Sequence, residues 1–379
     1  MKYISELIIT IDTVKKYKTA LIGCGRISGS HIGAFSKNSD CIALEAVCDI
    51  TPERAEDKAA EYKKQNPGST PKCYLDYKTM LSEIKPEIVS IATESGKHPE
   101  IAIDCLNSGA HVICEKPMAL STLEADRMNE AAKKNNKKLA VCFQNRFNEP
   151  VQRLRTAIEA GRFGKLLHGM IQIRWNRGPA YYAEAPWRGT WAQDGGTLMN
   201  QCIHGIDLLQ WMMGEDAVRV QSSLRRFNRP IEAEDFGAAI VEFKSGAIGI
   251  IEGSACVYPQ NLNETLSIFG EKGSVVIGGI AVNKIETWRL SDSVTLGDTE
   301  EKVLSPDVKD PPTVYGFGHS ALFRDFILAI NENREPFVSG ENGKKAVELI
   351  LAIYKSQKEG KAVELPCDYS TSKMEGFFV

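Results

Sequence analysis

The chain has 379 residues, of which 43% are hydrophobic and 25% are charged, and its 46 basic residues are balanced by 49 acidic ones. This composition excludes fibrous and disordered proteins. It also argues against a nucleic acid partner, because phosphate backbones are bound by an excess of lysine and arginine. A single hydrophobic core stops growing before this length, so we expect about two domains.

The N-terminal segment 1–16 contains a short apolar run at 7–9, interrupted by Glu6 and Asp12. It fits neither a signal peptide nor a membrane span and is either an extra strand or a start-site extension. The ten cysteines form no C-x-x-C pair, and several lie in apolar runs, as reduced thiols do. We therefore expect a cytoplasmic protein without a membrane partner.

The first part of the chain alternates short apolar runs with helical periodicity, which predicts a parallel, doubly wound α/β sheet. Residues typical of helix ends support three of the helices. Thr51 with Pro52 and Ser121 with Glu124 mark two helix starts, and Gly109 marks the end of a third. The expected strands are 20–23, 43–48, 88–92, 111–114 and 139–143, and the expected helices include 52–64, 98–108 and 122–134.

After about residue 148 the pattern changes to strands in succession, which predicts an α+β domain with an open, mainly antiparallel sheet. We therefore divide the chain into domains 1–147 and 148–379. A polar stretch at 291–312 reads as a surface loop. The expected helices are 151–160, 198–213, 319–331 and 342–357, and the expected strands are 166–175, 218–227, 236–243, 247–255, 264–269 and 274–277.

A glycine-rich turn, Gly23-Cys24-Gly25-Arg26-Ile27-Ser28, follows the first strand and opens a helix. Gly23 permits a tight turn, Gly25 allows the backbone to approach a pyrophosphate, and the helix N-terminus offers free N–H groups. Ser28 stands at the third fingerprint position and is small enough for close packing. The other interpretation is a glycine turn that binds nothing.

Asp49 ends the second expected strand, where a carboxylate accepts hydrogen bonds from the ribose hydroxyls of a dinucleotide. A carboxylate there repels a 2′-phosphate and favours NAD over NADP. Asp49 can instead cap the helix beside Thr51. Arg54 can pair with Asp49 or with a 2′-phosphate.

Glu115-Lys116-Pro117 follows a buried strand, at the sheet edge where ligands bind in open α/β folds. The Lys116 ammonium can hydrogen-bond a substrate hydroxyl, and a solvated lysine beside a turn is the alternative. Farther on, Asn200 and His204 lie four residues apart on an expected helix, with Asp207 one turn beyond. A buried core histidine is the alternative there, and metal-ligand spacing is absent.

Together these motifs resemble the glucose-fructose oxidoreductase and inositol dehydrogenase (Gfo/Idh/MocA) family from about residue 19 to the C-terminus. The resemblance implies a Rossmann domain, NAD as cofactor, and a C-terminal sheet that joins a homodimer or homotetramer. It implies that Lys116 orients the reacting hydroxyl, often beside a cis proline, that His204 takes the proton, and that Asn200 belongs to the catalytic set. Its cofactor-binding residues are Gly23, Gly25, Arg26, Ile27, Asp49, Thr93, Glu115 and Lys116.

Two positions depart from the family pattern. Many members carry Asp where this chain has Asn200, so the carboxylate that supports His204 is either missing or supplied from elsewhere, with Asp207 and Asp194 as the candidates. Glu94-Ser95 replaces the usual Pro-Asn.

Arginine and aromatic residues crowd the segment 174–191, which suits a sugar, a uronic acid or a nucleotide sugar. Trp175 and Trp191 can equally fill an interface. The candidate substrate contacts are Arg146, Arg188, Asn145 and His319.

Three functions remain open. The first is an NAD-dependent dehydrogenase that moves a hydride between the nicotinamide and a hydroxyl carbon of a sugar, polyol or nucleotide sugar. The second is a glycosidase that uses NAD for transient ring oxidation. The third is a non-enzymatic dinucleotide-binding regulator, which the presence of both Lys116 and His204 disfavours.

Overall fold

The computed structural model describes residues 15–291, 316 and 318–378. Most of the N-terminal segment and of the expected surface loop lie outside these residues. The chain forms two compact units. Unit 1 comprises Met1–Ala119, Leu123–Cys142 and His319–Lys344, and unit 2 comprises Leu120–Thr122, Phe143–Gly318 and Lys345–Val379. Whether 1–147 and 148–379 are separate domains stays a prediction.

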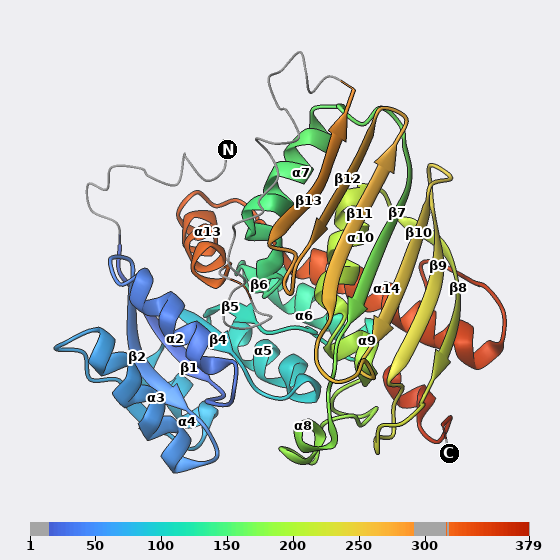
Figure 1. Ribbon diagram of the computed structural model, residues 1–379. Helices are drawn as coiled ribbons and strands as arrows, with labels where there is room; N and C mark the ends of the chain where they lie inside the picture. Colours follow the sequence, from blue (N-terminus) through green and yellow to red (C-terminus); the bar gives the residue numbers. More distant parts are fainter. Residues whose placement is uncertain (1–14, 292–315, 317, 379) are drawn as a thin grey trace. The chain divides into compact units, whose positions relative to one another are not determined.

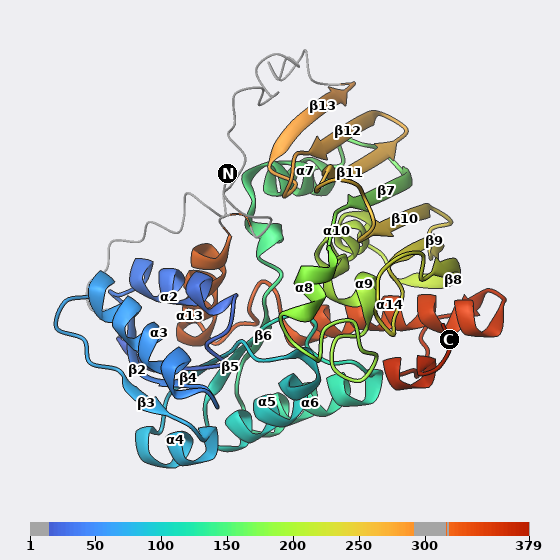
Figure 2. The ribbon, with the colours of Figure 1, turned by 60° about the horizontal axis from the view of Figure 1, so that its bottom comes forward.

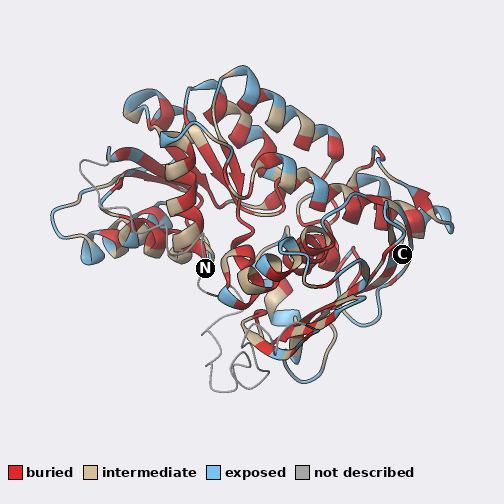
Figure 3. Ribbon diagram, turned by 90° about the horizontal axis from the view of Figure 1, so that it is seen from above, coloured by how far each residue is buried: buried red, intermediate tan, exposed pale blue. Residues whose placement is uncertain are grey.

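Unit 1 contains a six-stranded parallel sheet in the order β3-β2-β1-β4-β5-β6, as the sequence predicted (Figure 1). The central strands are buried along most of their length, because helices cover both faces (Figures 2 and 3). Its strands are β1 (Tyr17–Ile22), β2 (Ile42–Cys48), β3 (Lys72–Tyr74), β4 (Ile88–Ile91), β5 (His111–Cys114) and β6 (Leu139–Val141).

The helices α2 and α3 lie on one face of this sheet, and α5 and α6 lie on the other (Figure 2). The late helix α13 returns to pack beside α2, so that distant parts of the sequence build one unit. The helices are α2 (Ser28–Lys37), α3 (Pro52–Gln65), α4 (Tyr77–Ile84), η1 (Ser95–Lys97), α5 (His98–Asn107), α6 (Thr122–Lys134) and α13 (His319–Asn331).

Unit 2 contains an eight-stranded sheet in the order β13-β12-β11-β7-β10-β9-β8-β14. All of its pairings are antiparallel except that of β7 with β10. The mainly antiparallel α+β architecture is therefore confirmed. The strands are β7 (Leu166–Arg174), β8 (Ala217–Arg225), β9 (Phe236–Phe243), β10 (Ile248–Ser254), β11 (Asn263–Gly270), β12 (Gly273–Gly278), β13 (Lys284–Leu290) and β14 (Val363–Glu364).

Helices pack against one face of this sheet, where every second strand residue is buried (Figure 1). Within the described residues, no helix is long and apolar enough to cross a membrane. The helices are η2 (Gln144–Phe147), α7 (Glu149–Glu159), α8 (Pro179–Ala183), α9 (Gly196–Asn200), α10 (Ile203–Met213), α14 (Gly340–Glu359), which begins in unit 1, and η3 (Thr371–Met374).

Candidate active site

The glycine-rich turn after β1 has the shape that a dinucleotide pyrophosphate requires. Gly23 has a φ of +91°, and a Cβ there would lie 2.5 Å from the carbonyl of Ala92, so only glycine fits. A Cβ at Gly25 would meet no described atom within 4 Å, which leaves this side of the turn open. The buried Ser28 hydroxyl donates to the Gly25 carbonyl at 2.5 Å as α2 begins. The residues present therefore fit the cofactor.

Asp49 braces this turn from the end of β2. One carboxylate oxygen accepts a hydrogen bond from the Cys24 N–H at 2.8 Å, and the other accepts one from the Thr51 N–H at 2.9 Å. Thr51 is the N-cap residue of α3 with Pro52 at its first position, as predicted, but its side chain makes no cap hydrogen bond. Each carboxylate oxygen can still accept a ribose hydroxyl, so the ribose contact remains compatible with the structure.

Three further residues near the glycine-rich turn were considered for cofactor binding. Arg26 is exposed, and Ile27 is the N-cap residue of α2. Arg54 is also exposed. Ile50, which the sequence analysis missed, is 89% exposed next to Asp49 and offers an apolar surface for a flat base.

The loops after β4 and β5 meet at the carboxyl edge of the sheet. The Glu115 N–H donates to the carbonyl of Ile91 at 2.9 Å, and the Lys116–Pro117 peptide bond is cis, as the family resemblance implied. The buried ring of His98 ties the two loops, since its Nδ1 lies 2.7 Å from the Pro117 carbonyl and its Nε2 lies 3.1 Å from the Thr93 carbonyl. Burial lowers the pKa of His98. Gly23, Thr93 and Glu115 are thus brought to one edge.

The Glu115 carboxylate is buried against two imidazoles. His31 Nε2 lies 3.0 Å from Glu115 Oε1, and His31 Nδ1 lies 2.7 Å from the hydroxyl of Ser90. His319 Nε2 lies 3.7 Å from the same carboxylate oxygen. Burial alone would raise the pKa of Glu115, but the hydrogen bond with His31 and the nearby imidazole of His319 outweigh it and hold this pKa well below its usual range. His319, a predicted substrate contact, is therefore placed against Glu115.

In unit 2, the expected single helix over 198–213 is wrong, because the chain forms two helices, α9 and α10. The N–H of Cys202 bonds to the carbonyl of Thr197, five residues earlier, and this wide turn shifts the helical register. Asn200 and His204 are therefore not neighbours on one regular helix. His204 is 6% exposed, packs edge-on to Phe143, and has its Nε2 3.5 Å from Gln144 Nε2.

The start of α9 rests on a buried carboxyl group, Glu234. One of its oxygens accepts hydrogen bonds from the Leu198 N–H at 2.8 Å and the Tyr354 hydroxyl at 2.9 Å. Gly196 has a φ of +90°, and a Cβ there would collide with Glu234 at 1.9 Å. Burial raises the pKa of Glu234 to about 8. The paired glycines Gly195 and Gly196 are thus required by packing.

Asp207 and Arg146 form a buried ion pair with hydrogen bonds of 2.8 and 2.6 Å, and the guanidinium also lies over Trp211. Burial raises the pKa of Asp207, and Arg146 opposes that rise. The Asp207 carboxylate is thus paired with Arg146 rather than with His204. Asp194, the other carboxylate considered as support for His204, accepts hydrogen bonds from the Gly189 N–H and from the Asn200 side chain.

The loop before α9 holds a polar network around Tyr181. The hydroxyl of Tyr181 accepts hydrogen bonds from Arg188 and Gln201, each at 2.7 Å, and Arg177 donates to Gln201 at 2.8 Å. Both guanidinium groups lie over the Tyr181 ring. Two arginines and a tyrosine therefore form one surface that suits an anionic sugar derivative.

Other predicted residues of unit 2 are buried. Trp191 is fully buried against Tyr354, and Trp175 is 4% exposed, so neither presents an open aromatic face to a sugar. That they fill an interface between domains or subunits stays a prediction. Asn145 is 2% exposed, and its side-chain oxygen has no hydrogen-bond partner among the described residues. Such an orphaned buried acceptor is a candidate substrate contact.

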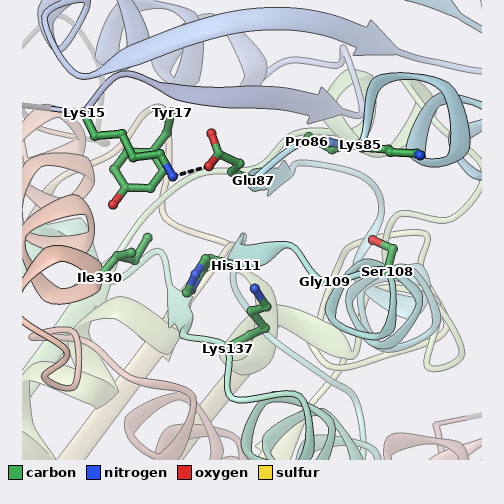
Figure 4. Close-up of a pocket in the computed structure, with 10 residues that line it drawn as sticks. All are labelled: Lys15, Tyr17, Lys85, Pro86, Glu87, Ser108, Gly109, His111, Lys137 and Ile330. Atoms are coloured by element: carbon green, nitrogen blue, oxygen red, sulfur yellow. Dashed lines mark hydrogen bonds and ion pairs between the residues drawn. The ribbon is translucent and has the colours of Figure 1, made fainter.

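A separate hollow of 300 Å³ lies at the opposite, amino edge of the unit 1 sheet (Figure 4). Lys85, Glu87, His111 and Lys137 are among the residues that line it, and burial lowers the pKa of His111 to about 4. Its position excludes it as the place of the pyrophosphate.

Lys116 belongs to unit 1 and His204 to unit 2, and their action on one carbon stays a prediction.

Two family models match the chain. The oxidoreductase family with an NAD-binding Rossmann fold matches residues 17–143, and the GFO/IDH/MocA C-terminal domain matches residues 151–276. A myo-inositol 2-dehydrogenase of Thermotoga maritima is 28% identical over 361 residues, which cover 92% of this chain and 98% of that protein.

Solved structures agree. The WlbA dehydrogenase of Bordetella pertussis, in complex with NADH and UDP-GlcNAcA, is 34% identical, with a TM-score of 0.82 and coverage of 94% of this chain and 100% of that one. The WlbA dehydrogenase of Chromobacterium violaceum, with the same ligands, is 36% identical, with a TM-score of 0.84 and coverage of 96% and 99%. The chain therefore belongs to the Gfo/Idh/MocA family and is an NAD-dependent oxidoreductase.

Proposed function

We propose that the chain oxidises a ring hydroxyl of a UDP-linked N-acetylated uronic acid of the UDP-GlcNAcA class, with NAD as the oxidant. One observation carries the proposal: two proteins crystallised with NADH and UDP-GlcNAcA are 34% and 36% identical to this chain over nearly its whole length. By comparison, the levoglucosan dehydrogenase structure is 22% identical and the myo-inositol 2-dehydrogenase of Thermotoga maritima is 28% identical.

The side chains of unit 2 support an anionic substrate. Arg177 and Arg188 converge on Tyr181 and supply positive charge with planar hydrogen-bond donors, which suit a carboxylate or a diphosphate. Asn145 adds a buried acceptor for a sugar hydroxyl or amide N–H. Arg146 is held by Asp207 in a buried ion pair, whereas Arg188 has only the exposed Glu184 at 3.6 Å, so Arg177 and Arg188 are better candidates for this recognition.

When bound, NAD would supply the acceptor for a hydride from the sugar carbon that carries the reacting hydroxyl. His204 takes the hydroxyl proton as the C–O bond becomes a carbonyl, and Lys116 donates a hydrogen bond that orients the same oxygen. Asn200 donates a hydrogen bond to Asp194 and accepts one from Gln201, and its membership of the catalytic set stays a prediction. Asp49, Gly23 and Gly25 would hold the dinucleotide, and Thr93 and Glu115 would line its nicotinamide ribose. The products are the keto sugar, the reduced cofactor and one proton, which together account for the two hydrogens lost by the alcohol.

The substrate class is tested by following NAD reduction with UDP-GlcNAcA, with UDP-GlcNAc, which keeps the diphosphate but lacks the carboxylate, and with myo-inositol. We expect turnover with the acid and at least about tenfold lower kcat/KM with UDP-GlcNAc, because the hydrogen bond to the sugar carboxylate is lost. Arg188→Lys keeps the charge but not the planar fork and should raise KM for the acid. Equal kcat/KM values for UDP-GlcNAcA and UDP-GlcNAc would overturn the proposed substrate class.

The same proposal includes a cytoplasmic enzyme that assembles through the sheet of unit 2. The ten cysteines contain no disulfide among the described residues, which suits a reducing compartment. On β9, Ile240 is 55% exposed, on the opposite side of the strand from its buried neighbours. Sedimentation of the wild type and of Ile240→Glu tests this assembly. We expect the wild type to be a dimer or tetramer, and we expect the buried charge of Ile240→Glu to weaken it. A monomeric wild type would contradict it.

A further inference from the structure

A buried cluster in unit 1 joins three elements that lie far apart in the sequence: His31 on α2, Glu115 after β5, and His319 at the start of α13. Their exposed fractions are 0%, 5% and 6%, and their potential ligand atoms lie within 4.8 Å of one another. The dehydrogenase chemistry assigned above uses neither histidine. Such a cluster in the interior must therefore be explained by what it does to the buried carboxylate.

The contacts of the Glu115 carboxylate favour its ionised form. His31 Nε2 lies 3.0 Å from one carboxylate oxygen, and the Lys116 N–H donates to the other at 3.2 Å. The pKa of Glu115 is held well below its usual range, while burial lowers the pKa of His319 and raises that of the neighbouring Cys142 thiol. Glu115 therefore carries a buried negative charge at this edge of the sheet.

The place of this charge matters for the cofactor. Glu115 follows β5 directly, and its N–H is bonded to the last residue of β4, Ile91, at the carboxyl edge of the sheet. In folds of this strand order, the nicotinamide half of a dinucleotide lies over this edge, beyond the switch point between β1 and β4. The oxidised nicotinamide ring is a cation and the reduced ring is neutral. A buried carboxylate therefore interacts differently with the two forms.

We propose that the His31–Glu115–His319 cluster makes the cofactor site prefer NAD⁺ over NADH, with Glu115 as the charge and the two histidines as positioning residues. The inference needs only the dinucleotide and is independent of which sugar is oxidised. It also accounts for the burial of three polar side chains at one point of the core, where a merely structural contact would be satisfied by apolar packing.

Equilibrium dissociation constants test the proposal. They are measured on nucleotide-free protein, by calorimetry for NAD⁺ and by fluorescence for NADH. Glu115→Gln keeps the shape of the side chain and removes its charge, so the ratio of the NAD⁺ constant to the NADH constant should rise about tenfold. The matched control is Glu87→Gln, which removes a carboxylate from the opposite edge of the same sheet, where it pairs with Lys15 (Figure 4). The control ratio should stay at the wild-type value.

A pair of His31 variants keeps the test decisive if Glu115→Gln does not fold. His31→Leu removes the donor to Glu115 and should shift the ratio in the same direction, whereas His31→Gln retains a donor and should stay near the wild type. Equal weakening of NAD⁺ and NADH in the Glu115 or His31→Leu variants would show a structural role and overturn the proposal. An equimolar metal ion in the purified protein that is lost in His31→Gln would also overturn it, because the metal would neutralise the carboxylate.

Discussion

Replacing Asp207 by Asn should destabilise unit 2 strongly. The change removes the carboxylate that accepts two hydrogen bonds from Arg146, in a pair whose side chains are only 5% and 2% exposed. Arginine does not lose its proton inside proteins, so the guanidinium would remain buried and charged. Breaking one side of a buried ion pair costs about 3–5 kcal/mol. The free energy of unfolding of unit 2 should fall by that amount.

Tryptophan fluorescence gives a direct assay, because all five tryptophans lie in unit 2. With a urea dependence of roughly 2 kcal/mol per molar, the midpoint of unfolding should fall by about 1.5–2.5 M. The double variant Arg146→Met with Asp207→Leu should recover most of this loss, since an apolar pair of similar volume replaces a buried ion pair at little cost.

A loss below about 1 kcal/mol in Asp207→Asn would refute this reasoning, because an isolated buried guanidinium would then cost almost nothing. The double variant also tests the predicted substrate contact of Arg146. Recovered stability with an unchanged KM would assign the pair to packing. Recovered stability with a raised KM would keep Arg146 as an anion contact.

Three further predictions concern the base, the ribose contact and pH. His204→Ala should lower turnover by about a hundredfold or more with NAD affinity nearly unchanged, and unchanged turnover would remove His204 from the mechanism. Asp49→Ala should weaken NAD more than NADP in equilibrium binding, whereas equal losses would reject the ribose contact. Burial raises the pKa of Glu234 from 4.5 to about 8, so between these pH values the folded protein keeps a proton that the unfolded chain releases. The free energy of unfolding should therefore fall as pH rises through this interval, by about 5 kcal/mol in all. Glu234→Gln should remove this part of the slope in urea titrations at several pH values. Glu242→Gln, at a half-exposed surface position, should leave the slope in place. An unaltered slope in Glu234→Gln would contradict the shift.

The sequence predicts the unit 1 sheet well because buried parallel strands appear as apolar runs between cap signals. The strand β3 escaped prediction because it has three residues that are exposed or half-buried, without an apolar run. The helix α4 that follows it was also missed. In unit 2, periodicity indicated one helix over 198–213, but it cannot reveal the wide turn between Thr197 and Cys202 that divides it.

The candidate site was predictable where its chemistry is local. Each local motif could be found because it directly follows a predicted strand: the glycine turn, Asp49 and Glu115-Lys116-Pro117. The contacts that tune them join residues far apart: His31 and Glu115 are separated by 84 positions, and Arg146 and Asp207 by 61. Only the fold brings such pairs together, so the roles of His31, His98 and Ser90 were not visible in the sequence.

Hydride transfer from the sugar to NAD is the central claim, and isotope tracing tests it most directly. The enzyme is mixed in excess with UDP-GlcNAcA deuterated at the ring carbons, and both products of a single turnover are analysed by mass spectrometry. The account predicts a nucleotide sugar that has lost one deuterium and one exchangeable hydrogen, with the deuterium carried by the reduced nicotinamide. An unaltered nucleotide sugar, or free UDP released without reduced cofactor, would contradict it.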